Sequence, residues 1–338
     1  MSSSSTVSTF EYLRSKTQVD IDSLDIKIAQ KGALGTPFSD ATSNQIEVFA
    51  QLSKPENASV IDDAKALASR VASQYPKLSL AELAVEAATV ILAARILPHI
   101  TGNVHVMCNP CYSYSTTKVL EAARRYHALF RHLKSDVDTA RVVIKVPATW
   151  EGMQAARTLQ SEGVKTLATT LFTMEQAILA GEVGCVSISP FIHELKTGVD
   201  PTYKDSDDLL HLCVDAQRYY ECHGISTRVK ACSAISIEEI LQLAGVAAHT
   251  IEPYYVESIL TTEWPVDRLT SVSLFKAEAL PRTSGNTAPT SYINDEARYR
   301  VDFAGSQDGQ GQLKLWQAIS IFCDYQKKVE FLMGDRKM

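Results

Sequence analysis

Short runs of β-branched and apolar residues alternate along the chain with longer segments whose apolar residues recur at helical spacing. The clearest unit contains a strand over Val104–Cys108, a helix over Lys118–Lys134 and a second strand over Val142–Val146. Strand, helix and strand in this order are typical of a βαβ unit with parallel strands. Four more strands are expected, each with room for a helix after it, at residues 166–171, 185–189, 228–232 and 248–251.

The type of sheet follows from what these strands lack. No Gly-x-Gly-x-x-Gly follows any of them, and no Gly-x-x-x-x-Gly-Lys-Ser/Thr occurs. A doubly wound nucleotide-binding sheet normally carries such a phosphate loop. We therefore predict a closed (β/α)8 barrel, a TIM barrel, with an additional C-terminal helix. The length of 338 residues is ordinary for one such domain.

The segments outside this alternation of strands and helices are assigned by their composition. Residues 1–10, which include a run of serines, are predicted to form a disordered tail. Residues 280–311, rich in Ser, Thr, Asn, Gly and Pro, predict a long surface loop, and residues 313–332 predict a C-terminal helix packed on the barrel. The apolar stretch Leu80–Leu97 carries charged residues at helical spacing and predicts an amphipathic helix, not a membrane span. We interpret residues 1–338 as a single domain.

Charge and cysteine content narrow the class of protein. Lys plus Arg number 33 against 39 Asp plus Glu, a formal net charge of -6, and no long basic tract occurs. This disfavours nucleic acid or an anionic membrane as a partner. The N-terminus has no secretory pattern, so we expect a cytoplasmic protein with reduced thiols. Cys108 and Cys111 have the spacing of half a zinc site, but no second pair is present, so no metal is expected.

The predicted strand Val142–Val146 carries a lysine, Lys145. Val142, Ile144 and Val146 share one face of this strand, whereas Lys145 lies on the other. The aliphatic face suits the helix layer, so Lys145 is expected to point into the barrel near its C-terminal mouth. Partial desolvation there favours the neutral amine, the form that Schiff-base chemistry needs. A lysine whose head reaches water is the alternative, and this strand alone does not decide between them.

Longer segments add a family resemblance. Ile144–Gly152 (Ile-Lys-Val-Pro-Ala-Thr-Trp-Glu-Gly) resembles the Schiff-base lysine motif of the transaldolase family. Asp40–Asn44 (Asp-Ala-Thr-Ser-Asn) is similar to that family's Asp-Ala-Thr-Thr-Asn-Pro. Ser189–Phe191, Glu239–Gly245 and the last helix continue the resemblance in family order, so it covers nearly the whole chain.

The resemblance implies a reaction that needs no cofactor. Lys145 attacks a ketone, water leaves, and a carboxylate takes a hydroxyl proton as the C–C bond breaks, which leaves an enamine for an aldehyde acceptor. Asp22 is the best match to the family's proton-abstracting aspartate. Asp20 remains the alternative, because the loop from Asp25 to Asp40 is longer than in the family.

Three further positions match the family's site. Thr169 falls on the residue that holds the catalytic water, Asn44 on a residue that binds substrate hydroxyls, and Ser189 on a substrate-binding residue. For each of them, ordinary strand-end hydrogen bonding is the alternative interpretation.

Four polar positions of the family pattern are replaced. Met107 stands where the family has a glutamate that works with the catalytic water, and Leu167 where it has a substrate-binding asparagine. Its two phosphate-binding arginines fall on Glu194 and Ile235. A thioether cannot shuttle protons, and neither an acid nor an alkyl group can replace a bidentate arginine. We therefore expect Met107, Leu167 and Ile235 to line one pocket with Lys145.

Three functions then compete, in this order. The first is a Schiff-base enzyme that makes or breaks a C–C bond next to the carbonyl of an unphosphorylated, more apolar small molecule. The second is an ordinary pentose-phosphate transaldolase, and the third is a non-catalytic barrel that binds a ligand or partner. The retained Asp22 and Lys145 speak against the third, because a buried lysine without a task is costly. A homodimer is left open.

Overall fold

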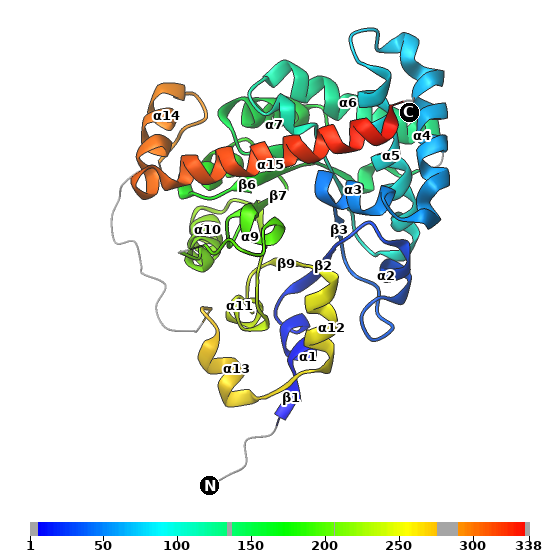
Figure 1. Cartoon of the computed structure of the whole chain (residues 1–338). Helices are drawn as coiled ribbons and strands as arrows, with labels where there is room; N and C mark the ends of the chain where they lie inside the picture. Colours follow the sequence, from blue (N-terminus) through cyan, green and yellow to red (C-terminus); the bar gives the residue numbers. More distant parts are fainter. Residues whose placement is uncertain (1–5, 134–136, 206, 276–289, 335–338) are drawn as a thin grey trace.

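Eight parallel strands close into a barrel in the order β2-β3-β4-β5-β6-β7-β8-β9. The computed structural model describes residues 6–133, 137–205, 207–275 and 290–334 (Figure 1). The barrel strands are β2 Gln18–Asp22, β3 Ala41–Thr42, β4 Val104–Met107, β5 Val142–Pro147, β6 Thr166–Leu171, β7 Ser187–Pro190, β8 Arg228–Ala231 and β9 Ala248–Ile251. The predicted (β/α)8 barrel is confirmed.

The strand bounds follow the hydrophobic pattern closely. β6 and β9 have the predicted bounds, whereas β7 begins at Ser187, two residues later than expected. β3 contains only two residues, too few for a pattern of alternation to reveal it. Register places Met107 of β4 and Leu167 of β6 beside Lys145 of β5. Side chains that are paired in this way point to the same face of a parallel sheet.

Helices connect the strands and cover the barrel. They are α2 Ile26–Lys31, α3 Gln45–Leu52, α4 Ala58–Val71, α5 Leu80–Ile96, α6 Thr116–Leu133, α7 Trp150–Ser161, α8 Met174–Glu182, α9 Leu195–Val199, α10 Leu210–His223, α11 Ile237–Gln242, α12 Pro253–Thr261 and α13 Val266–Val272. Within the described ranges, no helix has the length and apolar character that a membrane crossing requires.

Helix α5 is not the amphipathic helix that the sequence predicted. Its residues are buried without interruption from Leu83 to Ala93, because α4, α6 and α15 (Gln310–Met333) all pack against it. The charge of Glu86 is tolerated inside because Arg125 of α6 donates to it from two nitrogens, one of them 2.6 Å from Oε1. The charged residue Glu86, which suggested a solvent-exposed face of the helix, is therefore part of a buried ion pair.

The two ends of the chain are more ordered than predicted. The expected tail over residues 1–10 is wrong from Thr6 onward: β1 (Thr6–Ser8) pairs antiparallel with β10 (Glu263–Pro265), and α1 (Thr9–Arg14) follows directly. The partner strand is remote in sequence, so local composition could not reveal this pairing. Residues 1–5 lie outside the described residues.

The predicted loop over residues 280–311 is also wrong from Glu296 onward. Helix α14 (Glu296–Gly305) and a 3-10 turn over 306–309 occupy this part, and residues 280–289 lie outside the described ranges. Tyr299 and Phe303 lie one helical turn apart and are both buried, and the Tyr299 ring lies 5.6 Å from that of Trp150. This apolar pair anchors a segment whose overall composition is typical of a loop.

Helix α15 begins three residues before the predicted C-terminal helix and ends one residue after it. It runs across the barrel against α3, α5 and α9 (Figure 1). Its packing brings a residue close to the C-terminus of the chain, Phe322, to the mouth of the barrel.

The interior of the barrel contains a buried ionic cluster. Nζ of Lys230 lies 2.5 Å from Oδ2 of Asp20 and 2.6 Å from Oδ2 of Asp40. Nε2 of His105 lies 3.0 Å from the same oxygen of Asp40. All four side chains are almost fully buried, and they belong to β8, β2, β4 and the residue that precedes β3. Burial alone would raise the pKa of Asp40, but the hydrogen bond from His105 and the charge of Lys230 hold this pKa well below its ordinary value.

The stability that Asp40 contributes should therefore depend on pH. A carboxylate with a depressed pKa stabilises the fold above its ordinary pKa of about 3.9, and this contribution is lost as the pH falls below that value. Below about pH 4 we expect the wild type to lose up to about 1.4 kcal/mol of unfolding free energy per pH unit through this group. Asp40→Asn should lose correspondingly less.

Urea denaturation of both proteins between about pH 5 and about pH 3 measures this difference. Asp63→Asn, which removes an exposed carboxylate on α4, serves as the control and should keep the wild-type pH dependence. Parallel pH dependences of the wild type and Asp40→Asn would contradict the prediction.

Candidate active site

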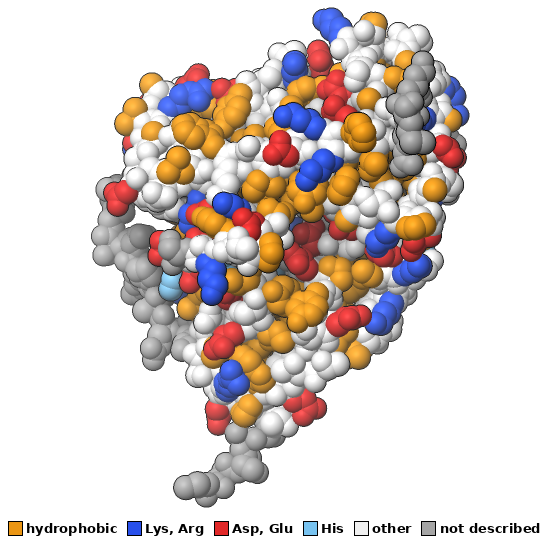
Figure 2. Space-filling view, in the orientation of Figure 1, with side chains coloured by type: hydrophobic (Ala, Val, Ile, Leu, Met, Phe, Trp, Pro, Cys, Tyr) orange, Lys and Arg blue, Asp and Glu red, His pale blue; other side chains and the backbone are white. Residues whose placement is uncertain are grey.

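A cavity of about 430 Å³ opens at the C-terminal ends of the barrel strands. Figure 2 shows acidic side chains gathered in a recess near the middle of this face, with apolar side chains around it. The described residues that line the cavity are Asp22, Thr42, Asn44, Ile46, Glu47, Lys145, Ser189, Phe191, Leu195, Gly198, Val199, Cys232, Ser233, Thr250, Glu252, Pro253, Tyr254 and Phe322. Barrel enzymes carry their catalytic groups at this end.

Lys145 occupies the inward face of β5, as its place in the strand predicted. Its side chain is 6% exposed and reaches the cavity between Met107 and Leu167, its register partners. Its ammonium makes no hydrogen bond or ion pair with any described residue. The other two lysines that are buried in the described ranges, Lys230 and Lys314, each have a carboxylate partner. Lys145 thus combines burial with a free amine.

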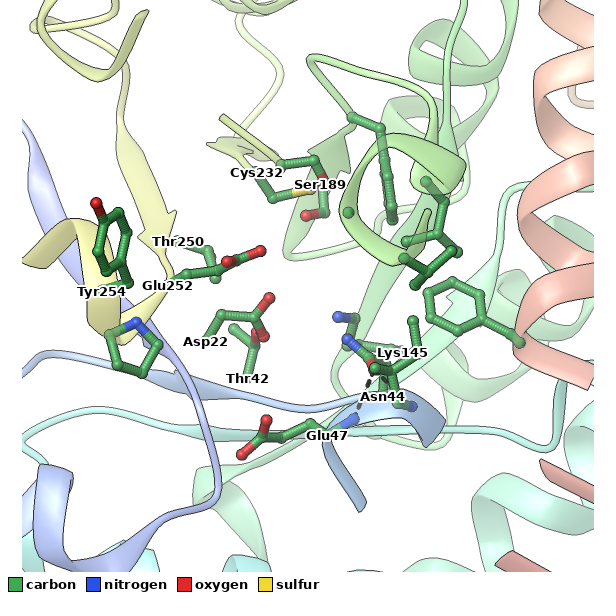
Figure 3. Close-up of a pocket in the computed structure, with 18 residues that line it drawn as sticks. Asp22, Thr42, Asn44, Glu47, Lys145, Ser189, Cys232, Thr250, Glu252 and Tyr254 are labelled. Carbon is green, nitrogen blue, oxygen red and sulfur yellow. Dashed lines mark hydrogen bonds between the residues drawn. The ribbon is translucent and has the colours of Figure 1, made fainter. Parts of the chain in front are cut away.

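Asp22 is the last residue of β2 and faces the same open space as Lys145 (Figure 3). Its Oδ1 accepts a hydrogen bond of 2.7 Å from Oγ1 of Thr42, which fixes the carboxylate and leaves its second oxygen toward the cavity. Asp20, the alternative to Asp22, does not line the cavity. It is fully buried and bound to Lys230. The structure therefore favours Asp22 as the group that can act beside Lys145.

Asn44 lies in the cavity wall because it caps helix α3. Its Oδ1 accepts hydrogen bonds from the backbone N–H groups of Ile46 (2.9 Å) and Glu47 (3.1 Å), drawn as dashed lines in Figure 3. Such an N-cap is expected for asparagine at a helix start. Because the oxygen is occupied, only the amide N–H donors of Asn44 remain for a ligand, and these suit a hydroxyl or carbonyl oxygen.

Ser189 of β7 lines the cavity, whereas Thr169 of β6 does not. Thr169 is fully buried, and its Oγ1 has no hydrogen-bond partner among the described residues.

Two residues near the cavity have left-handed backbone: Thr170 of β6 has φ of 55°, and Ser233 after β8 has φ of 62°. Left-handed backbone at residues other than glycine is strained and tends to occur at functional sites. Both positions lie at the cavity end of the strands.

We expected Met107 and Leu167 to line the cavity, but they do not. They are 2% and 1% exposed and lie beside Lys145 on the inward faces of β4 and β6. Their role in the structure is to surround the lysine with apolar groups. The cavity surface takes its apolar character from other residues, which are Ile46, Phe191, Leu195, Val199 and Phe322.

Glu194 and Ile235 lie away from the cavity, so these two expectations are corrected. Oε2 of Glu194 accepts hydrogen bonds from Tyr203 (2.6 Å) and Gln317 (2.5 Å), outside the cavity wall. Ile235 is 44% exposed in the segment between β8 and α11, where its carbonyl accepts a hydrogen bond from Tyr255. Counting along the sequence from Lys145 could not foresee how these two connecting segments are folded.

Glu252, Glu47 and Phe322 are among the cavity residues that the sequence did not single out. Glu252 follows β9 directly, and a residue at the C-terminal end of a barrel strand is a candidate for a catalytic role, so this signal was present. Glu47 lies in the first turn of α3, and Phe322 comes from α15. Neither position carries a local signal, because only the packing of these helices brings them to the mouth. Among the described residues, no group of three or more His, Cys, Asp or Glu side chains is placed to hold a metal ion.

Comparisons with known proteins agree with this architecture. The family model described as Transaldolase/Fructose-6-phosphate aldolase matches residues 19–297. A transaldolase of Gibberella intermedia is 32% identical over 295 residues, which cover 84% of this chain and 85% of that protein. A transaldolase of Schizosaccharomyces pombe is 29% identical over 293 residues (84% and 85%), and one of Shewanella amazonensis is 29% identical over 332 residues (96% and 98%).

A parallel barrel with a lysine and carboxylates at one cavity in its mouth defines a barrel enzyme of the aldolase type. The chain belongs to the transaldolase/fructose-6-phosphate aldolase family, which confirms the predicted resemblance.

Two of the buried lysines, Lys230 and Lys145, should respond differently to the same substitution. Lys230→Met leaves Asp20 and Asp40 buried without their cation and is expected to lower the free energy of unfolding by about 3 to 5 kcal/mol. Lys145→Met breaks no ion pair among the described residues and meets apolar neighbours, so we expect a change below about 1 kcal/mol. Urea denaturation at neutral pH measures the free energy of unfolding of both variants. Equal losses would contradict the conclusion that Lys230 is ion-paired and Lys145 is not.

Proposed function

We propose that Lys145 forms a Schiff base with an unphosphorylated carbonyl substrate and that Asp22 moves the proton when the adjacent C–C bond is broken or made. The observation that carries this proposal is the free, buried amine of Lys145 opposite a fixed carboxylate in one cavity. An amine that is buried but not ion-paired is available as a nucleophile once it loses its proton.

The steps use groups that line the cavity. Nζ of Lys145 adds to the carbonyl carbon, and loss of water gives an iminium ion. The second oxygen of Asp22 accepts the proton of a substrate hydroxyl, the C–C bond breaks, and its electrons move into the iminium to form an enamine. The enamine either takes a proton and is hydrolysed, or attacks an aldehyde. Asn44 can donate its amide N–H to a substrate oxygen, and Ser189 supplies a hydroxyl on the opposite wall.

The charges of the cavity support an unphosphorylated substrate. Its described lining contains three carboxylates, on Asp22, Glu47 and Glu252, and one cation, Lys145. No arginine lies among those residues. A phosphate group would therefore lack the bidentate partner that usually binds it.

The distribution of polarity supports a substrate with an apolar part. The carboxylates come from the end of β2, the start of α3 and the residue after β9. An apolar wall is formed by Phe191, which follows β7, by Leu195 and Val199 of α9 and by Phe322 of α15. Burial of an apolar group against this wall would contribute about 25 cal/mol per Å². We infer a carbonyl compound whose reacting end is hydroxylated and whose remainder is apolar.

Ordinary transaldolase activity is the second candidate, and the comparisons favour it. The relatives from Gibberella intermedia, Schizosaccharomyces pombe and Shewanella amazonensis are all named transaldolase, and two of them cover 84% of this chain. Both candidates use the same lysine chemistry, so they differ only in the substrate that the cavity accepts.

Borohydride is expected to trap a carbonyl compound on Lys145. We expect sodium borohydride with hydroxyacetone, butan-2-one or cyclohexanone to add the mass of the reduced adduct to the peptide that contains Lys145. Peptide mass spectrometry locates the adduct. Lys145→Ala should abolish it, whereas Lys77→Ala, at an exposed lysine, should not.

Asp22→Asn should still form the adduct on Lys145, but its rate of C–C bond cleavage or formation should fall about 10²- to 10⁴-fold. Absence of an adduct across the panel would refute the Schiff base.

Fructose 6-phosphate is expected to be a poor donor. Two missing charge-assisted phosphate contacts, at about 1.5 to 3 kcal/mol each, correspond to at least a hundredfold loss in affinity. The measurement is kcat/KM for fructose 6-phosphate, with an authentic transaldolase as the control in the same assay. Turnover comparable to that control would establish the second candidate and leave the Schiff base intact.

A further inference from the structure

Glu252 is the carboxylate of the cavity to which no role has yet been assigned. It follows β9 directly and stands at the start of α12, where its side chain makes no capping hydrogen bond. Figure 3 shows its carboxylate projecting into the cavity beside Asp22, on the side that faces Lys145. The position is open to solvent through the cavity.

The three carboxylates of the cavity differ in their partners. Asp22 is held by Thr42, and Oε1 of Glu47 accepts three hydrogen bonds, including one of 2.8 Å from the backbone N–H of Leu24. The side chain of Glu252 makes no hydrogen bond or ion pair with any residue in the described parts of the chain. It alone has neither a donor nor a cation that would favour its ionised form.

Two carboxylates that face Glu252 also favour its neutral form. Partial burial, and then the negative charges of Asp22 on β2 and Glu47 on α3, raise the pKa of Glu252. Tyr255 of α12 lies near enough for Glu252 to contribute to the raised pKa of its phenol, and Lys145 lies across the cavity. Two carboxyl groups with different environments in one site are typical of an acid and base pair.

The proposed reaction needs an acid that has so far been missing. After Lys145 has added to the carbonyl carbon, the new hydroxyl group leaves readily only if it receives a proton. Met107, beside Lys145, cannot supply one, because a thioether carries no proton to donate. Asp22 must stay ionised for its own role as base. A protonated Glu252 can supply this proton.

We propose that Glu252 is the catalytic proton donor for the loss of water from the adduct on Lys145. This inference rests on the proposed Schiff base at Lys145. The carboxylic acid of Glu252 gives its proton to the hydroxyl oxygen, the C–O bond breaks with release of water, and the nitrogen lone pair forms the C=N bond of an iminium ion. Glu252 is left as a carboxylate.

The return step follows from the same geometry. When the product iminium is hydrolysed, the Glu252 carboxylate takes a proton from the attacking water, which restores both the acid and the carbinolamine. The hydroxyl of Thr250, which is 5% exposed and lines the cavity, has no hydrogen-bond partner within the described residues. It lies on β9 two residues before Glu252 and can position that water.

The test measures how fast the iminium forms. Sodium cyanoborohydride reduces iminium ions, so at saturating reagent and hydroxyacetone the rate of adduct formation on Lys145 reports the loss of water. Glu252→Gln keeps the size of the side chain and is expected to slow this rate about hundredfold. The matched control is Glu257→Gln, on the exposed side of the same helix α12, which should keep the wild-type rate. Circular dichroism checks that both variants are folded.

The pH dependence separates proton donation from a structural effect. The ratio of the wild-type rate to the Glu252→Gln rate is expected to fall as the pH rises through the pKa of Glu252, because only the wild type loses its proton donor.

The outcomes distinguish the two proposals. A slow Glu252→Gln variant with a falling ratio supports the assignment. A wild-type rate, or a slow rate with a ratio that does not change with pH, would overturn the role of Glu252 and leave the Schiff base standing. No adduct on Lys145 in the wild type would refute the Schiff base itself, and the assignment of Glu252 with it.

Discussion

Closure of eight parallel strands into a barrel is the constraint on which the rest of the structure depends. It directs every second side chain of each strand into one enclosed interior, where water cannot stabilise charges. Polar groups there must find protein partners or face an opening. The chain places one lysine in each situation: Lys230 is bound between Asp20 and Asp40, whereas Lys145 reaches the cavity without a partner. The first lysine stabilises the barrel and the second is available for chemistry.

The mouth of the barrel is assembled from distant parts of the chain. β2 supplies Asp22, the start of α3 supplies Asn44, β9 leads into Glu252, and α15 contributes Phe322. Carboxylates gather on one side and apolar groups on the other. The proposal of an unphosphorylated substrate rests on this cavity, because its described lining contains no arginine that could bind a phosphate.

Replacement of a catalytic group need not occur at the same position. Met107 of β4 has no proton to donate, and we propose that Glu252, which follows β9 and lines the cavity, supplies the carboxyl group instead. In a barrel all strand ends converge on one site, so a function lost on one strand can be supplied from another. Burial and the charges of Asp22 and Glu47 raise the pKa of Glu252, whereas a hydrogen bond from Thr42 holds the carboxylate of Asp22 in place.

The sequence by itself determined the elements whose signal is local. Alternation along Val142–Val146 directed Lys145 inward, and the motif around it identified the family, because strand periodicity and short motifs need no distant partner. Tertiary structure alone decided which side chains meet. It placed Ile235 on the surface and moved Glu194 outside the cavity wall. It also brought in Phe322, because packing of α15 on the barrel depends on contacts between segments far apart in the chain, which no local pattern encodes.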